Sequence, residues 1–173
     1  MKTLISVAVI LAALASVAVG QGKADVDRLG EKIASQLESR LSSWHYRRVE
    51  PFGPSSNIVV QSWSSTNRIV KVTVAIRESV ADAKKEFRSF LQFRREPQEL
   101  TGFGDEAFAP ERDGSDVVLR RGRYVIYIST VAEVESDSDA RNLSPVELET
   151  RRKTEVQRIG KEFAKQLSSI ELQ

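Results

Sequence analysis

The chain has 173 residues, with 26 Lys and Arg, 24 Asp and Glu, one His and no Cys, for a formal net charge of +2. So small a basic excess argues against nucleic-acid binding, which needs concentrated positive charge. The absence of Cys excludes disulfides and thiol catalysis, and a single His makes a zinc site improbable.

The first twenty residues have the pattern of a secretory signal peptide. Residues 4–19 are almost entirely Leu, Ile, Val and Ala, after a short basic start at Lys2. Ala18 and Gly20 place small residues three before and one before a cut ahead of Gln21. An uncleaved anchor is the rival interpretation, but this apolar run is shorter than the roughly 20 residues that span a bilayer. We expect a signal peptide at 1–20 and one exported domain at 21–173, periplasmic or secreted, with no membrane attachment after cleavage.

The rest of the chain alternates between helical and strand-like patterns. Apolar residues spaced by three and four predict helices, and strict alternation predicts strands, most clearly at 68–77. Ser144 with Glu147 forms a capping-box signature, and Ser79 with Asp82 resembles one. In chain order we predict a helix at 25–43, strands at 44–49, 58–63 and 68–77, a helix from 79, strands at 107–109, 116–120 and 123–131, and a helix from 144.

This order of elements predicts the fold class. It lacks the βαβ alternation of a parallel sheet, which favours an antiparallel α+β domain. We expect a sheet of about six strands with three amphipathic helices packed on it, in the order helix, three strands, helix, three strands, helix. The alternative is a three-layer α/β/α sandwich in which the first helix covers the second face of the sheet.

Residues 102–107 have the sequence Gly-Phe-Gly-Asp-Glu-Ala, which matches the pattern G-x-G-x-x-G/A of dinucleotide-binding sites. A dinucleotide site needs a strand before the glycines and a helix after them, whereas here a helix precedes and the following residues cannot propagate one. Asp105 and Glu106 would also place negative charge where phosphate must lie. We therefore interpret Gly102, Gly104, Asp105 and Glu106 as a structural turn with positive φ at its glycines, and we predict no cofactor.

Candidates for catalysis or metal binding are few. Asp105 and Glu106 are adjacent, and neighbours on an extended strand point to opposite faces. We expect one to cap backbone donors of the turn and the other to meet water. His45 has no Gly-x-Ser-x-Gly nucleophile to accompany it. The acidic segment 133–139 lacks the Gly and Glu of an EF-hand loop, so we predict a solvated loop and no metal site, with a weak calcium contact left open.

One stretch resembles known sequences. Gly-x-Gly-Asp-Glu-Ala at 102–107, a Gly-containing hairpin, and Val-Val-Leu-Arg-Arg-Gly-Arg-Tyr-Val-Ile-Tyr-Ile at 117–128 are similar to a run in many small exported bacterial proteins of unknown function. A Ser-x-x-x-Ala helix often precedes that run, matched here from Ser79. The similarity is strongest over 102–129 and looser over 63–172. It implies an exported α+β domain, often lipid-anchored or fused to others, without established catalytic residues; anchoring does not carry over, because the lipobox Cys is lacking.

Strand alternation also predicts a surface for a partner. If Ile58 and Val60 belong to the core, their neighbours turn to a second sheet face that mixes Trp, Tyr and Arg, residue types enriched at interaction hot spots. This predicted partner face comprises Gln61, Trp63, Lys71, Thr73, Arg120 and Tyr127.

Two functions from different classes follow. The first is a non-enzymatic exported domain of unknown role that binds a protein or a small envelope component. The alternative is a small hydrolase that works through His45 and carboxylates. An exposed sheet face with aromatic side chains favours the first, and a cleft that gathers His45 with Asp or Glu favours the second.

Overall fold

The computed structural model describes residues 24–49, 57–92, 96–109 and 116–172. The predicted signal peptide and its cleavage position lie outside these ranges. Within them, no helix is both long enough and apolar enough to cross a membrane.

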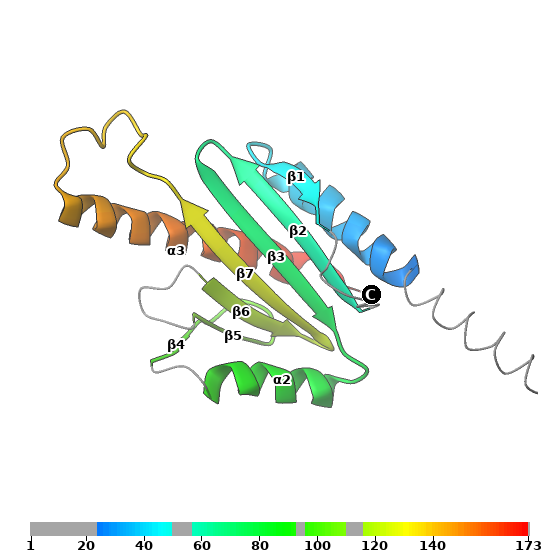
Figure 1. Ribbon diagram of the computed structural model, residues 1–173. Coiled ribbons are helices and arrows are strands. Elements are labelled where there is room, and N and C mark those ends of the chain that lie inside the picture. The colour runs from blue at the N-terminus through cyan, green and yellow to red at the C-terminus, as the bar shows by residue number, and fades with distance from the viewer. Residues whose placement is uncertain (1–23, 50–56, 93–95, 110–115, 173) are drawn as a thin grey trace, which may run out of the picture.

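The described residues form an α+β fold with an antiparallel sheet, as the sequence predicts (Figure 1). The sheet has seven strands rather than six, because the two-residue strand β4 pairs with β5 and is too short to leave an alternating pattern. After a helix at residues 24–40, the elements are β1 (His45–Arg48), β2 (Ile58–Ser65), β3 (Arg68–Ile76), α2 (Val80–Gln92), β4 (Gln98–Glu99), β5 (Glu106–Ala109), β6 (Asp116–Arg121), β7 (Tyr124–Ala132) and α3 (Pro145–Ser169).

The strand order is β1-β2-β3-β7-β6-β5-β4. Each half of the chain contributes a run of adjacent antiparallel strands, and the two runs join where β3 pairs with β7 along the full length of both. The β2–β3 hairpin turns at Thr66 and Asn67, and Asn67 takes a positive φ of 56°, which Asn tolerates better than most residues.

Two helices cover the first face of the sheet. The N-terminal helix contributes Ile33 and Leu37, and α3 contributes Phe163 and Leu167, all with fully buried side chains. They pack with inward residues of every long strand, among them Val72 of β3. In Figure 1 both helices pass behind the strands. This layer is the main hydrophobic core.

The second face is covered by α2, which makes the molecule three-layered. Ala83 and Phe87 of α2 pack on Phe108, Val118 and Val125 of β5, β6 and β7. The first helix, which the sandwich alternative placed on this face, packs with α3 on the other. Because α2 is short, it covers mainly the β5–β7 side of the second face.

Both predicted helix starts are confirmed. Ser144 accepts a hydrogen bond from the backbone N–H of Glu147, and the Glu147 carboxylate accepts one from the Ser144 N–H, which completes the capping box. At the other helix the Asp82 N–H donates to Ser79 Oγ at 3.1 Å. These side chains satisfy backbone donors that the first helical turn leaves unpaired.

The assignment of Gln61 and Trp63 to the second face was wrong. Val59, Gln61 and Trp63 point into the main core, and Ile58 and Val60 lie on the second face. Trp63 packs against the rings of Tyr46 and Phe163, with centroids 5.2 and 6.0 Å away. A buried Gln obscures the alternation, but its amide is satisfied, since Gln61 Nε2 donates to the carbonyl of Gly30 at 2.7 Å and Gln61 Oε1 accepts from Trp63 Nε1.

Truncating Trp63 tests this placement. Trp63→Ala should lower the free energy of unfolding by about 3–5 kcal/mol, the range for a fully buried aromatic side chain. The matched control is Ile69→Ala on the adjacent strand, where half of the side chain is exposed, and a loss of about 1 kcal/mol or less is expected. Urea unfolding followed by circular dichroism measures both, and equal losses would contradict the assignment of faces.

Candidate functional site

The turn at residues 101–105 connects β4 to β5, and its glycines have the positive φ that the sequence predicts. Gly102 has φ of 84° and Gly104 has φ of 62°. A Cβ atom on Gly104 would lie 2.6 Å from the backbone oxygen of Arg120, whereas Gly102 faces open space. Gly104 is therefore required both for its conformation and for the close approach of the turn to β6.

Asp105 and Glu106 converge on a single cation, while both carboxylate side chains also remain in contact with solvent. Asp105 Oδ2 lies 2.7 Å from Arg120 Nη1 and also accepts from the Gly122 N–H, and Glu106 Oε2 lies 2.6 Å from Arg120 Nε. The Arg120 side chain is only 5% exposed. Convergence is possible because Asp105 precedes β5 and so escapes the alternation that Glu106 obeys.

A cavity of about 560 Å³ lies beside this turn, between α2 and β5. Phe87, Leu91 and Phe108 give it an apolar side, and Glu99 and Asp105 give it an acidic rim. The glycines do not form a phosphate cradle here, because α2 precedes the turn and strand β5 follows it. With Arg120 already neutralised by two carboxylates, the described part of the turn acts as a structural clamp between β5, β6 and the β6–β7 turn.

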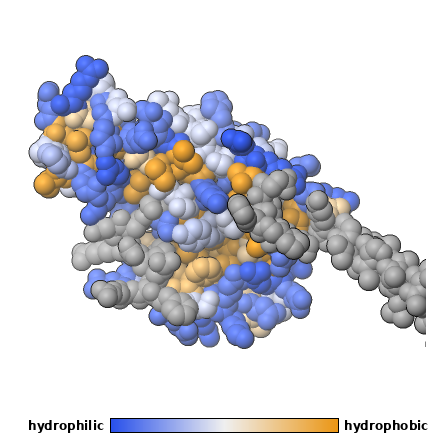
Figure 2. All heavy atoms as spheres, viewed as in Figure 1, coloured by the Kyte–Doolittle hydropathy of each residue, from blue (hydrophilic) through white to orange (hydrophobic). Residues whose placement is uncertain are grey.

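Among the described residues, part of the second sheet face is left uncovered by α2 and carries exposed side chains. We call it the open face and define it by residues of β1, β2, β3 and β7 whose side chains share this side: Arg47, Ser62, Ile69, Lys71, Thr73, Ser129 and Val131. Ile69 and Val131 are 50% and 57% exposed and are direct cross-strand partners. Figure 2, viewed from this side, shows hydrophobic and hydrophilic side chains mixed over the sheet.

Four of the six predicted partner-face residues lie on the second face, but only two are in the open part. Lys71 is exposed and Thr73 half-buried. Tyr127 marks the border: its ring stacks on Phe90 of α2, and its hydroxyl donates to Asp116. Arg120 is on the same side but is buried in its carboxylate clamp, so it was wrongly included as an accessible residue.

His45 lies at the start of β1, opposite Ser64, with its side chain exposed. Among the described residues it makes no hydrogen bond or ion pair with a carboxylate. No group of three or more His, Cys, Asp and Glu side chains is arranged to hold a metal ion in those same ranges. The hydrolase alternative needs a carboxylate beside His45, and the described structure offers none.

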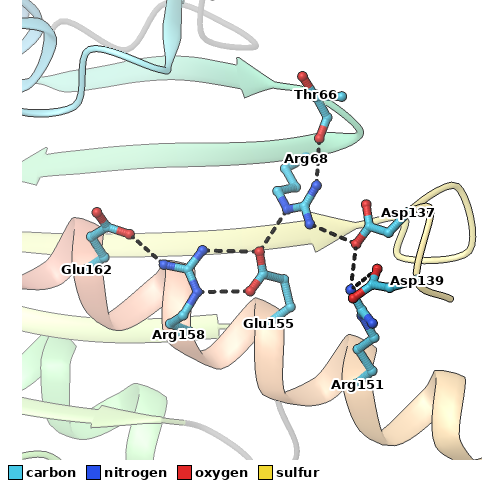
Figure 3. A network of polar contacts seen from close by, with 8 residues as sticks. All are labelled: Thr66, Arg68, Asp137, Asp139, Arg151, Glu155, Arg158 and Glu162. Carbon is cyan, nitrogen blue, oxygen red and sulfur yellow. Dashed lines mark hydrogen bonds and ion pairs between the residues drawn. The ribbon is translucent and has the colours of Figure 1, made fainter.

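The acidic segment at 133–139 is a loop with mostly exposed side chains, as expected, but ion pairs also connect it to the rest of the fold. Arg68, the first residue of β3, donates to Glu155 Oε1 of α3 at 2.8 Å and to Asp137 Oδ2 at 3.1 Å (Figure 3). Arg151 donates to Asp137 and, at 2.8 Å, to Asp139. This network ties the segment to the β2–β3 hairpin and to α3.

Glu155 is the titrating group most affected by the network. Hydrogen bonds from Arg158 and then Arg68 stabilise its carboxylate and lower its pKa from 4.5 to about 2, although partial burial opposes the shift. The spacing of Glu155, Arg158 and Glu162 along one helix is a local signal for their pairing, whereas Arg68 is far away in the chain and no local spacing reveals its pairing with Glu155.

The chain was compared with models of protein families, with curated proteins and with solved structures, and none of the three comparisons found a match.

We expect Gly104→Ala to destabilise the protein by about 1 kcal/mol or more, because alanine is strained at positive φ and its Cβ would strike the Arg120 carbonyl. Gly102→Ala has the strain without the contact and is the matched comparison. Thermal unfolding should rank Gly104→Ala as the more damaging change. The reverse order would show that the contact with β6 does not constrain the turn.

The Glu155 network predicts a pH dependence of stability. Because the pKa of Glu155 is lowered on folding, its contribution is complete above about pH 4.5 and is lost as pH falls toward about 2. Glu155→Gln should lower stability at neutral pH and flatten the acid limb of the stability curve. Glu162→Gln, which removes an exposed partner of Arg158, is the control and should leave that limb nearly unchanged. An unchanged acid limb in Glu155→Gln would contradict the assignment.

Proposed function

We propose that this chain is a non-enzymatic exported domain that binds a protein partner through the open face. The observation that carries the proposal is the uncovered part of the second sheet face, where apolar and basic side chains are exposed together. Export is supported by the apolar run at residues 4–19 and the small residues that follow it.

The exposed apolar side chains of the open face, Ile69 and Val131, are adjacent to each other rather than isolated. Isolated exposed apolar side chains are ordinary on protein surfaces, and contiguous ones indicate contact surfaces. Ile69 and Val131 are directly opposite on β3 and β7, so their side chains form one continuous patch. Val60 of β2 is half-buried on the same side, but it opposes Thr73 and is separated from this pair by Ser62 and Lys71.

The charges of the open face indicate the chemistry of the partner. Arg47, Ser62, Lys71, Ser129 and Asp116 form one row across five strands, because each is the register partner of the next. Asp116 accepts the hydrogen bond of Tyr127 at the end of this row. The row therefore contains two exposed cations, Arg47 and Lys71, and one carboxylate, Asp116, which already accepts a hydrogen bond. This charge balance favours a partner surface that is acidic and has apolar side chains of its own.

Site-specific photocrosslinking tests this function. A photoreactive amino acid at Thr73 reports on the open face, and one at Lys84 on the outer side of α2 is the control. The photoreactive residue at position 73 should crosslink to one acidic envelope protein, and the one at position 84 should not. That protein, once purified, is then titrated against the unmodified domain.

Paired charge and polarity changes test the contact itself. Lys71→Glu with Val131→Asp should weaken binding of the purified partner by about tenfold or more. Val80→Asp with Lys84→Glu makes the same changes on α2, where Val80 is 48% exposed, and should leave the affinity unchanged. Equal weakening by both variants, or binding that neither variant affects, would contradict the open face as the binding surface.

A further inference from the structure

A second feature lies away from the open face, between the N-terminal helix and the end of the β6–β7 hairpin. There a cavity of about 430 Å³ is lined by Arg28, Leu29 and Lys32 of the helix and by Arg123 and Tyr124 of the hairpin. This volume is within the range of about 300–1,000 Å³ that is usual for small-molecule sites. The helical residues share one side of the helix because their spacing is close to one and two turns.

Two of the three cations of this cavity have no anionic partner among the described residues. Among the described residues, the side chains of Lys32 and Arg123 make no hydrogen bond or ion pair, and Lys32 is half-buried. Arg28 pairs at 3.7 Å with Asp25, the one carboxylate of the lining. Three cations and one carboxylate leave a net charge of +2 in the cavity. Two cations without a partner among the described residues line the cavity, so an anion would be favoured here by charge-assisted hydrogen bonds.

The floor of the cavity is apolar and holds one cation in place. Leu29 and Tyr124 are 7% and 8% exposed and belong to the main core. The guanidinium carbon of Arg123 lies 5.6 Å from the centre of the Tyr124 ring, a cation–π contact that keeps the charge at the cavity mouth. The lining therefore combines a buried apolar surface with positively charged side chains beside it.

We propose that this cavity binds an organic phosphate monoester with an apolar group. The dianionic head would lie among Lys32, Arg28 and Arg123, where guanidinium groups match phosphate oxygens with two parallel hydrogen bonds. The apolar group would lie on Leu29 and Tyr124. A monoester carries close to two negative charges at neutral pH, which matches the net charge of the lining. The same headgroup chemistry occurs in soluble esters and in phosphatidic acid.

Calorimetric titration with phenyl phosphate tests the site at about pH 8, where the probe is a dianion. One molecule should bind per chain, and inorganic phosphate should bind more weakly because it lacks the apolar group. Affinity should fall when pH is lowered through the second phosphate pKa near 6. Vesicles with and without phosphatidic acid distinguish the lipid source from the soluble one, since only the lipid source predicts co-sedimentation with the former.

Two paired variants decide whether the named residues bind the probe. Lys32→Glu with Arg123→Glu should weaken phenyl phosphate binding by about tenfold or more, the loss of one charge-assisted contact or more. Lys84→Glu with Arg88→Glu changes the same residue types on exposed positions of α2 and should leave binding unchanged. No binding of phenyl phosphate to the unmodified protein, or equal weakening by both variants, would overturn the proposal.

Discussion

The pairing of β3 with β7 is the interaction on which the rest of the structure depends. It joins the two halves of the chain along nine residues of each strand, Arg68–Ile76 and Tyr124–Ala132. Because side chains alternate strictly along a strand, this register determines which residues enter the core on both sides of the junction. A one-residue slip of β3 would bury Lys71 and expose Val72, whereas a one-residue slip of β7 would carry Ile126 and Ile128 out of contact with α3.

Arginines near the ends of the strands connect this central pairing to the surrounding elements. Arg68 at the start of β3 holds the 133–139 segment and α3, and Arg77 just after β3 forms an ion pair with Glu86 of α2. Arg120 clamps the turn before β5, and Arg121 donates to the carbonyl groups of Ser168 and Ile170 at the end of α3. Arginine suits this role because its planar fork serves several acceptors at once.

Unequal coverage of the sheet has a functional consequence. The first face lies under two helices, whereas the second lies under α2 on only one side. The edge strands are short, which limits unwanted pairing with other chains, so accessible binding surface is concentrated on the face rather than on the edges. The open face lies on the second side of the sheet, and the basic cavity lies on the side of the N-terminal helix.

Local patterns in the sequence predicted the secondary structure and the positive φ of Gly102 and Gly104, because both depend on near neighbours in the chain. The sequence assigned the side chains of β2 to the wrong faces of the sheet because Gln61 is polar and yet buried. Its amide donates a hydrogen bond to the carbonyl of Gly30, which lies in the N-terminal helix and is not a near neighbour in the chain. The pairings of Arg120 and Arg68 were missed for a related reason, since their partners are brought near only by the fold. The one available signal in the sequence was Gln61 itself, because a polar residue within an apolar strand indicates a buried hydrogen bond.

The second sheet face is covered by α2 at one end of β3 and is open at the other end among the described residues. Since the chain has no Cys, single cysteines report on this directly, with Lys71→Cys in the open part and Ala75→Cys under α2, four residues apart on the same side of β3. The rate of thiol alkylation is measured under native conditions against each variant unfolded in urea. Lys71→Cys should react nearly as fast as its unfolded form, and Ala75→Cys should be slower by about tenfold or more, because it reacts only after local opening. Equal protection of both cysteines would contradict the account.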